Sequence, residues 1–115
     1  MRLKSDLYTS DQLGIIDKII NILELDNEKS TTLYDLDNDE DKQLNIISLI
    51  PEIRIFFSAS NIQGVSKPDS LLRPWLSIIR QIAKKKYKII GQDCTIKKNN
   101  KLIRTKRYYF YEKQP

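Results

Sequence analysis

Two alternating segments near the end of the chain, separated by a short basic turn, constrain the fold more than any other feature. Residues 87–96 and 102–111 are rich in β-branched and aromatic residues, which favour strands. Between them, segment 97–101 (Lys-Lys-Asn-Asn-Lys) places two asparagines where a tight turn needs left-handed backbone geometry. The pattern predicts a β-hairpin. Because an isolated hairpin is only marginally stable in water, it must pack or pair with other parts of the chain.

Helical periodicity precedes the predicted hairpin. Apolar residues at three- and four-residue spacing predict a helix that Asp11 caps and that ends near Leu25. Segment 31–36 (Thr-Thr-Leu-Tyr-Asp-Leu) is β-branched, aromatic and alternating, so we expect one short strand there. This strand would pair with the hairpin and complete a three-stranded antiparallel sheet.

Acidic residues mark the start of a second helix. Asp37 followed by Glu40 resembles a capping box, so this helix should begin at Asp37 or Asn38. Pro51 then either begins a new short helix or kinks the existing one, because a proline inside a helix removes a hydrogen bond. The buried stripe of the second helix is expected to be Leu44, Ile47 and Ile50.

A further helix is predicted over residues 71–86, after a loop over residues 58–70. Asp69 or Ser70 would cap it, and Pro74 is tolerated in its first turn. One face is apolar and should be buried: Leu72, Trp75, Leu76, Ile79, Ile82 and Ala83. Polar and cationic residues recur at i, i+4, i+7 and i+11 and form an outward stripe with a glutamine beside it: Arg73, Ser77, Arg80, Lys84 and Gln81.

The charges are sorted along the chain. Residues 1–60 contain 6 Lys/Arg and 12 Asp/Glu, a net charge of −6, whereas residues 61–115 contain 14 Lys/Arg and 3 Asp/Glu, a net charge of +11. The two values sum to the overall +5. Such asymmetry indicates a polyanionic partner if the cations of the second half converge on one face.

The hairpin repeats the basic character of the preceding helix. Alternation along the last strand places Arg104 and Lys106 on the face opposite Ile103 and Thr105. Each basic element alone has an ordinary explanation, since lysines commonly end helices and loop tips are commonly solvated. Two basic elements that follow one another in the chain favour a nucleic-acid interface. The candidate DNA-binding residues are Lys67, Arg73, Ser77, Arg80, Gln81, Lys84, Lys85, Lys97, Lys98, Asn99, Lys101, Arg104, Lys106 and Arg107.

Several kinds of chemistry are excluded by residue types. The chain has no histidine and a single cysteine, Cys94, so His-based triads and the common zinc sites are not available. The alternating aspartates over residues 35–41 lack the glycine and glutamate that an EF-hand loop requires. The three glycines are far apart and form no phosphate-binding loop. We therefore expect a non-enzymatic protein without cofactor, metal or small-molecule substrate. The absence of long apolar runs argues against a membrane span.

The order of elements resembles that of winged-helix DNA-binding domains, in which a helical core with an interposed strand precedes a basic hairpin, the wing. Segment 72–82 (Leu-Arg-Pro-Trp-Leu-Ser-Ile-Ile-Arg-Gln-Ile) stands where that family has its recognition helix. Its rhythm is similar to predicted DNA-binding modules of large eukaryotic DNA viruses. The resemblance implies that the helix over 71–86 enters the major groove, while the wing over 96–107 follows the phosphate backbone or the minor groove. The break at Pro51 and the long loop over 58–70 depart from the family pattern.

The sequence thus predicts one α+β winged-helix domain over residues 1–115, with flexible ends at 1–10 and 112–115. We expect it to bind double-stranded DNA as an architectural or packaging protein or as a transcription regulator. An intracellular location is expected, which for a viral protein means the nucleus, the viral factory or the virion. A homodimer would double the DNA contacts, and the sequence leaves it open. Two alternatives also stay open: a protein–protein adaptor, and an RNA or single-stranded DNA binder that uses the aromatic last strand.

Overall fold

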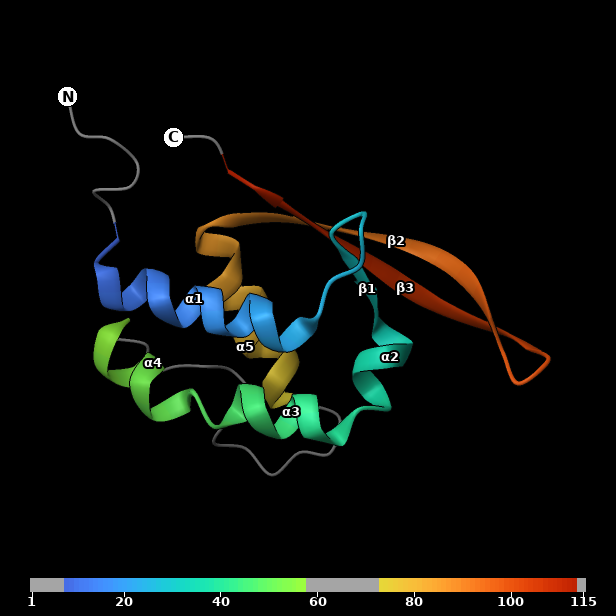
Figure 1. Cartoon of the computed structure of the whole chain (residues 1–115), viewed down its shortest axis with the longest axis horizontal. Helices are drawn as coiled ribbons and strands as arrows, with labels where there is room; N and C mark the ends of the chain where they lie inside the picture. The colour runs from blue at the N-terminus through green and yellow to red at the C-terminus, as the bar shows by residue number, and fades with distance from the viewer. Residues whose placement is uncertain (1–7, 58–72, 114–115) are drawn as a thin grey trace.

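The computed structural model describes residues 8–57 and 73–113, which form helices packed against one face of a long, twisted hairpin (Figure 1). The hairpin crosses the helices and then projects beyond α2 (Figure 1). In chain order the elements are α1 (Ser10–Leu23), β1 (Ser30–Thr32), α2 (Leu33–Asp37), α3 (Glu40–Ile47), α4 (Ile50–Phe56), α5 (Pro74–Ile82), the 3-10 helix η2 (Ala83–Lys85), β2 (Tyr87–Lys98) and β3 (Lys101–Glu112).

The sheet has three strands in the order β1-β3-β2, and both pairings are antiparallel. The register of the hairpin runs from Tyr87 opposite Glu112 to Lys98 opposite Lys101. The turn consists of Asn99 and Asn100, with φ of 52° and 64°, as the two asparagines predict. The α+β class, the hairpin and the three-stranded sheet are confirmed. Both strands run closer to the turn than expected, because residues 97, 98 and 101 pair within the ladder.

The predicted strand over 31–36 is only partly correct. Thr31 and Thr32 lie in β1, but the chain becomes helical at Leu33. The reason is local, since the Thr32 hydroxyl accepts a hydrogen bond from the Asp35 amide at 3.1 Å and so caps α2. Thr32 is therefore both the last residue of β1 and the N-cap residue of α2.

Two other helix starts differ from the predictions. α1 begins with a capping box between Thr9 and Gln12, in which each side chain bonds the other's backbone amide at 3.0–3.1 Å. Asp11 is thus in the first turn and is not the cap. α3 is capped by Asp39, whose carboxylate accepts from the Lys42 amide at 3.0 Å; Asp37 instead belongs to α2. In each case the residue nearest the available amides forms the cap.

Pro51 lies in the first turn of the short helix α4, which confirms a new helix rather than a kink. The expected stripe of α3 is wrong at Leu44, which is 55% exposed. Ile46, Leu49 and Ile53 are buried instead.

The helix predicted over 71–86 is α-helical over Pro74–Ile82 and continues as η2 to Lys85. Arg73 is its extended N-cap residue, so it precedes the helix rather than lying on it. Residues 71 and 72, the candidate caps Asp69 and Ser70 and the predicted loop over 58–70 lie outside the described residues.

The predicted flexible ends are too long on both sides. Ser10 already belongs to α1, and Glu112 belongs to β3. The Lys113 amide donates to the Lys86 carbonyl at 2.9 Å, which holds the end of β3 against the start of β2. Residues 1–7 and 114–115 lie outside the described part of the chain.

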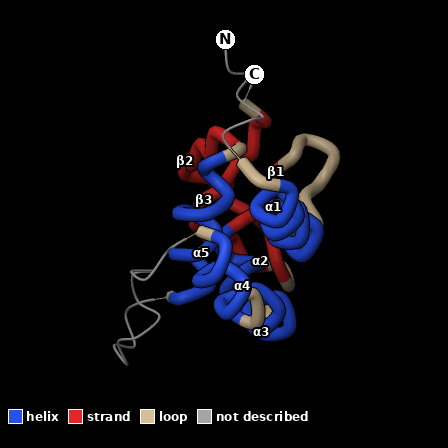
Figure 2. Tube along the Cα trace, turned by 90° about the vertical axis from the view of Figure 1, so that its left-hand side faces the viewer, coloured by secondary structure: helices blue, strands red, loops and turns tan. Residues whose placement is uncertain are grey.

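The core lies between the helices and one face of the hairpin (Figures 1 and 2). α1 contributes four residues, α5 contributes Trp75 and three isoleucines, and β3 contributes two aromatic residues. Trp75 is 5% exposed, as its shared face with Ile79 and Ile82 predicts. The principal buried residues are Ile15, Ile16, Ile19, Leu23, Trp75, Ile78, Ile79, Ile82, Tyr108 and Phe110. This packing holds α5 rigidly beside the base of the hairpin.

Candidate nucleic-acid interface

A groove of about 590 Å³ runs between the end of α5 and the base of the hairpin. Five cationic residues line it, and none of its lining residues is acidic. We call it the basic groove; its lining consists of Arg80, Gln81, Lys84, Tyr87, Lys88, Ile89, Gly91, Lys106, Tyr108 and Lys113. Cations from the consecutive helices α5 and η2 and from the hairpin therefore converge on one concave surface, where they reinforce each other's attraction for a polyanion.

Arg80 is the best-positioned cation of the basic groove. Its Nη2 donates to the Tyr108 hydroxyl at 3.0 Å, and its Cζ lies 5.9 Å from the centre of the Tyr108 ring. Tyr108 is 8% exposed and belongs to the core. Arg80 itself is exposed but is held against this buried ring, which lowers the entropy that it loses when it binds a ligand.

Gly91 makes room for the ring that supports Arg80. Gly91 and Tyr108 are direct neighbours in the hairpin register. A Cβ atom on Gly91 would lie 3.0 Å from Cε1 and 3.2 Å from Cδ1 of Tyr108. Because glycine has no side chain, the Tyr108 ring can lie against the strand at Gly91. The support of Arg80 therefore depends on this glycine.

The structure brings together four of the predicted residues, Arg80, Gln81, Lys84 and Lys106. It adds Lys88 and Lys113, which sequence reasoning missed. Their signal was the hairpin register, because pairing Tyr87 with Glu112 places the neighbours of both residues at the same end of the ladder. Ser77 is half-buried and does not line the groove.

Three predicted cations are instead paired with carboxylates of the acidic half. Arg73 lies 3.4 Å from Asp37, Lys98 lies 3.6 Å from Asp35, and Arg107 lies 3.2 Å from Asp26. These are N···O distances, and the pairs connect the hairpin and the start of α5 to α2 and to the turn before β1. Their charges are therefore partly neutralised within the protein.

Lys85 and Lys86 also face the helices rather than the groove. The Lys85 ammonium lies 5.9 Å from the centre of the Phe57 ring. Lys86 lies 3.4 Å from Asp17 and 3.6 Å from Glu112. Burial lowers the pKa of Lys86, but the neighbouring anionic groups outweigh it, so the pKa is raised above its ordinary value. Lys86 thus joins η2 to α1 and β3 and fixes one wall of the groove.

The projecting half of the hairpin carries the remaining predicted cations. Arg104 and Lys106 alternate with Ile103 and Thr105 and share the face of Tyr108, which confirms the predicted alternation. Lys97, Asn99, Lys101 and Arg104 are all exposed. Of these, Lys97 and Arg104 lie on the same face as Lys106, which also carries Asp93 directly opposite Lys106, whereas Lys101 lies on the other face.

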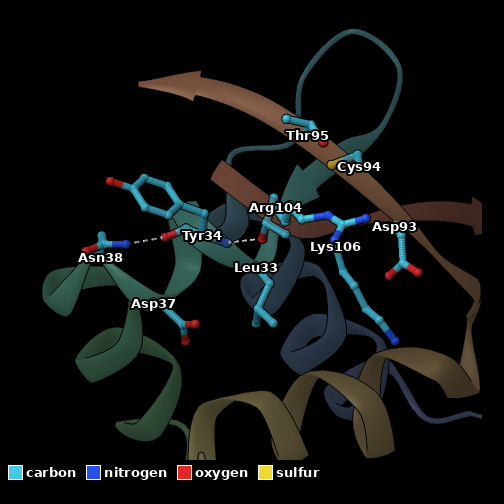
Figure 3. Close-up of a pocket in the computed structure, with 10 residues that line it drawn as sticks. Leu33, Tyr34, Asp37, Asn38, Asp93, Cys94, Thr95, Arg104 and Lys106 are labelled. Atoms are coloured by element: carbon cyan, nitrogen blue, oxygen red, sulfur yellow. Dashed lines mark hydrogen bonds between the residues drawn. The ribbon is translucent and has the colours of Figure 1, made fainter. Parts of the chain in front are cut away.

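A second pocket of about 730 Å³ lies between α2 and the hairpin (Figure 3). Arg104 and Lys106 extend from its hairpin side, and Asp93 lies near them, while Asp37 lies on the α2 side (Figure 3). The Tyr34 amide donates to the Thr105 hydroxyl at 3.0 Å and ties α2 to β3. With both signs of charge in its lining, this pocket favours an anion less than the basic groove does. Cys94 is half-buried in it.

Lys67, the first residue of the predicted set, lies outside the described residues. Within residues 8–57 and 73–113, no cluster of three or more potential metal ligands occurs. None of the helices in those ranges has the length and apolar character needed to cross a membrane. Comparison of the chain with protein-family models, curated proteins and solved structures finds no match.

Proposed function

We propose that this protein binds double-stranded DNA, with the basic groove and the adjoining face of the hairpin against the phosphate backbone. The observation that carries the proposal is the convergence of five cations from α5, η2, β2, β3 and the residue after β3, without an acidic residue in the lining of the groove. Each phosphate that such a surface neutralises releases condensed counterions, and this release drives binding. Arg and Lys at the mouth of a groove also steer the encounter with DNA.

In this proposal the molecule acts as a winged helix. The exposed side of α5 and η2, with Arg80 and Lys84, enters the major groove, and the projecting hairpin follows the backbone as the wing. Two features support this arrangement. α5 packs its apolar face on the core, and the hairpin starts beside η2 at the end of α5 before it projects beyond α2 (Figure 1). Gln81 is the one amide of the groove, and an amide side chain can pair with adenine. A non-enzymatic architectural protein or regulator is the role that we propose.

The test is fluorescence anisotropy with a random duplex at increasing salt concentration. We expect the affinity to fall steeply from about 50 to 200 mM salt, and the log–log slope to decrease by about 0.9 for each phosphate contact removed. The double variant Lys84→Ala/Lys106→Ala should lower this slope by about two units. Its matched control is Lys18→Ala/Arg54→Ala, which removes the same charge from α1 and α4 and should leave the slope close to that of the unchanged protein.

Equal effects of the two double variants would contradict the assignment of the groove. Failure of the unchanged protein to bind long duplex DNA at physiological salt would overturn the function itself and favour the adaptor. Arg80→Ala adds a finer measurement across several duplex sequences. A uniform loss of affinity would show that Arg80 contacts phosphate rather than bases.

One observation favours a second candidate, binding of single-stranded nucleic acid. The Tyr109 and Tyr111 rings stack at 6.3 Å with an interplanar angle of 8°, on the face opposite Tyr108. Tyr111 is 49% exposed, and unpaired bases stack on such rings. Competition between duplex and single-stranded probes separates the candidates: preference for the single strand, lost in Tyr111→Ala, would support this one.

A further inference from the structure

We infer that the free edge of β2 pairs with the same edge of a second copy of this chain, antiparallel and with Thr95 on the two-fold axis. The strand order β1-β3-β2 places β2 at the edge of the sheet. β2 is twelve residues long, and within the described ranges only β3 pairs with it. A long unpaired edge is a template for another strand, and lysines that guard it also restrict which registers are allowed.

The charges of β2 select one register. In an antiparallel pair, directly opposed residues share a face of the sheet. Lys88, Asp93, Lys97 and Lys98 are the charged residues of β2. Opposite charges are directly opposed only when Asp93 faces the partner's Lys97, which by symmetry occurs twice and places Thr95 on the axis. The register centred on Asp93 would instead oppose two aspartates and set Lys88 against Lys98 twice.

The selected register also covers apolar surface. On the sheet face opposite Asp93, Cys94 lies across from the partner's Ile96, again twice. Ile96 is paired with Ile103 within its own hairpin, and all three residues are half-buried in the single chain. Pairing would join these side chains across the axis into one continuous apolar patch.

The hairpin geometry supplies the backbone hydrogen bonds for this pairing. A two-residue turn makes Lys98 and Lys101 a hydrogen-bonded pair, and such pairs then alternate along the ladder. Asp93, Thr95 and Lys97 therefore direct their amide and carbonyl groups away from β3. These are the residues that face one another in the selected register, so each can bond its counterpart.

The pairing has a consequence for DNA binding, and this step alone rests on the proposed function. A two-fold axis through paired antiparallel edges stands perpendicular to the sheet, so both basic grooves lie on the same side. Ile89 and Gly91 line each basic groove. The midpoint between these two residues is five residues before Thr95 along β2. Counting five residues in each copy, ten residues at about 3.3 Å each separate the two grooves by about 33 Å. One turn of duplex DNA is about 34 Å.

Charge exchange tests the register without DNA. Asp93→Lys and Lys97→Asp each create like-charge pairs across the axis, so each variant alone should dimerise at least about tenfold more weakly in sedimentation equilibrium. An equimolar mixture of the two variants should recover the dimer, because every opposed pair is then of opposite sign. Lys88→Asp is the control for Lys97→Asp: it makes the same charge change outside the paired segment and should leave dimerisation unchanged.

Disulfide formation locates the axis. In a Cys94→Ser background, Thr95→Cys should cross-link two chains under mild oxidation, because directly opposed Cα atoms lie about 5.5 Å apart. Gln92→Cys in the same background should not cross-link, since its counterpart would be six residues away along the strand. Circular dichroism of each variant confirms the folded state.

A folded, unchanged protein that stays monomeric, or a mixture that shows no recovery, would overturn the pairing. Cross-linking at Gln92→Cys instead of Thr95→Cys would overturn the register. These measurements of dimerisation are independent of DNA binding, which is tested separately with the Lys84→Ala/Lys106→Ala variant. A dimer without DNA affinity would retain this inference and reject the proposed function.

Discussion

At the scale of single residues, Asp26 shows how a short acidic turn is organised around one carboxylate. It accepts hydrogen bonds from the Glu28 and Ser30 amides at 2.9 Å and from the Ser30 hydroxyl at 2.8 Å. Arg107 donates to it at 3.2 Å. The Ser30 hydrogen bonds chiefly, with the Arg107 charge as a smaller cause, hold the pKa of Asp26 below 3.8. All of these donors favour the ionised form.

The lowered pKa of Asp26 predicts a stability contribution with a defined sign. Because the folded pKa lies below the unfolded value, the contribution is fully present above about pH 3.8 and is lost as the pH falls through the folded pKa. An NMR titration of the carboxyl carbon should show a midpoint below 3.8. Ser30→Ala should raise that midpoint more than Arg107→Gln does. The reverse order would mean that the ion pair dominates.

At the scale of elements, the turn of the hairpin depends on two residues with positive φ. Asn99 and Asn100 adopt φ of 52° and 64°, which asparagine tolerates and a β-branched residue does not. Asn100→Gly should therefore stabilise the tip, while Asn100→Val should cost about 1–2 kcal/mol.

This difference should be measured by amide hydrogen exchange at the tip, because the projecting end can open without unfolding the core. Exchange of the Lys98 and Lys101 amides should be about tenfold faster in Asn100→Val than in the unchanged protein. Asn38→Val, far from the hairpin turn in sequence, is the control for the change of residue type and should leave these amides unaffected. Equal exchange in all variants would show that the turn conformation does not limit opening.

The helices and strands also show how far local patterns reach. The hairpin, the break at Pro51 and the buried face with Trp75 were predictable, since each depends on neighbours a few residues away. The cap of α1 and the start of α2 were not, because Thr9 and Thr32 compete with nearby acidic residues for the same amides. The change from strand to helix at Leu33 depends further on contact with β3, where Thr105 accepts from the Tyr34 amide.

At the scale of the whole molecule, the acidic half both stabilises the basic half and limits its charge. Ion pairs at 3.2–3.6 Å link Asp26, Asp35 and Asp37 to the hairpin and to the start of α5. Their side chains are 28–47% exposed, and exposed pairs contribute about 0–1 kcal/mol each. The fold therefore does not depend on them, whereas the proposed DNA binding would depend on the cations that have no carboxylate partner within the described part of the chain.

Added salt should consequently weaken the proposed DNA binding much more than it lowers the free energy of unfolding. Between about 50 and 200 mM salt, we expect the free energy of unfolding to change by less than about 1 kcal/mol, because exposed ion pairs are weak and already screened. Over the same range the affinity for DNA should fall by orders of magnitude. Urea unfolding and anisotropy at matched salt concentrations provide the two measurements. Parallel losses would mean that salt acts on the fold rather than on the interface.

Sequence patterns were enough to predict the hairpin, most of the helical segments, the alternating faces and the sorting of charge, because periodicity and turn chemistry act between residues close in the chain. The packing of the folded chain was needed to show which cations have a carboxylate partner among residues 8–57 and 73–113. Arg80, Lys84 and Lys106 converge with Lys88 and Lys113, while other candidates meet carboxylates from the first half. A charge is neutralised or left free by the groups that folding brings within a few ångströms of it, and those groups are distant in sequence.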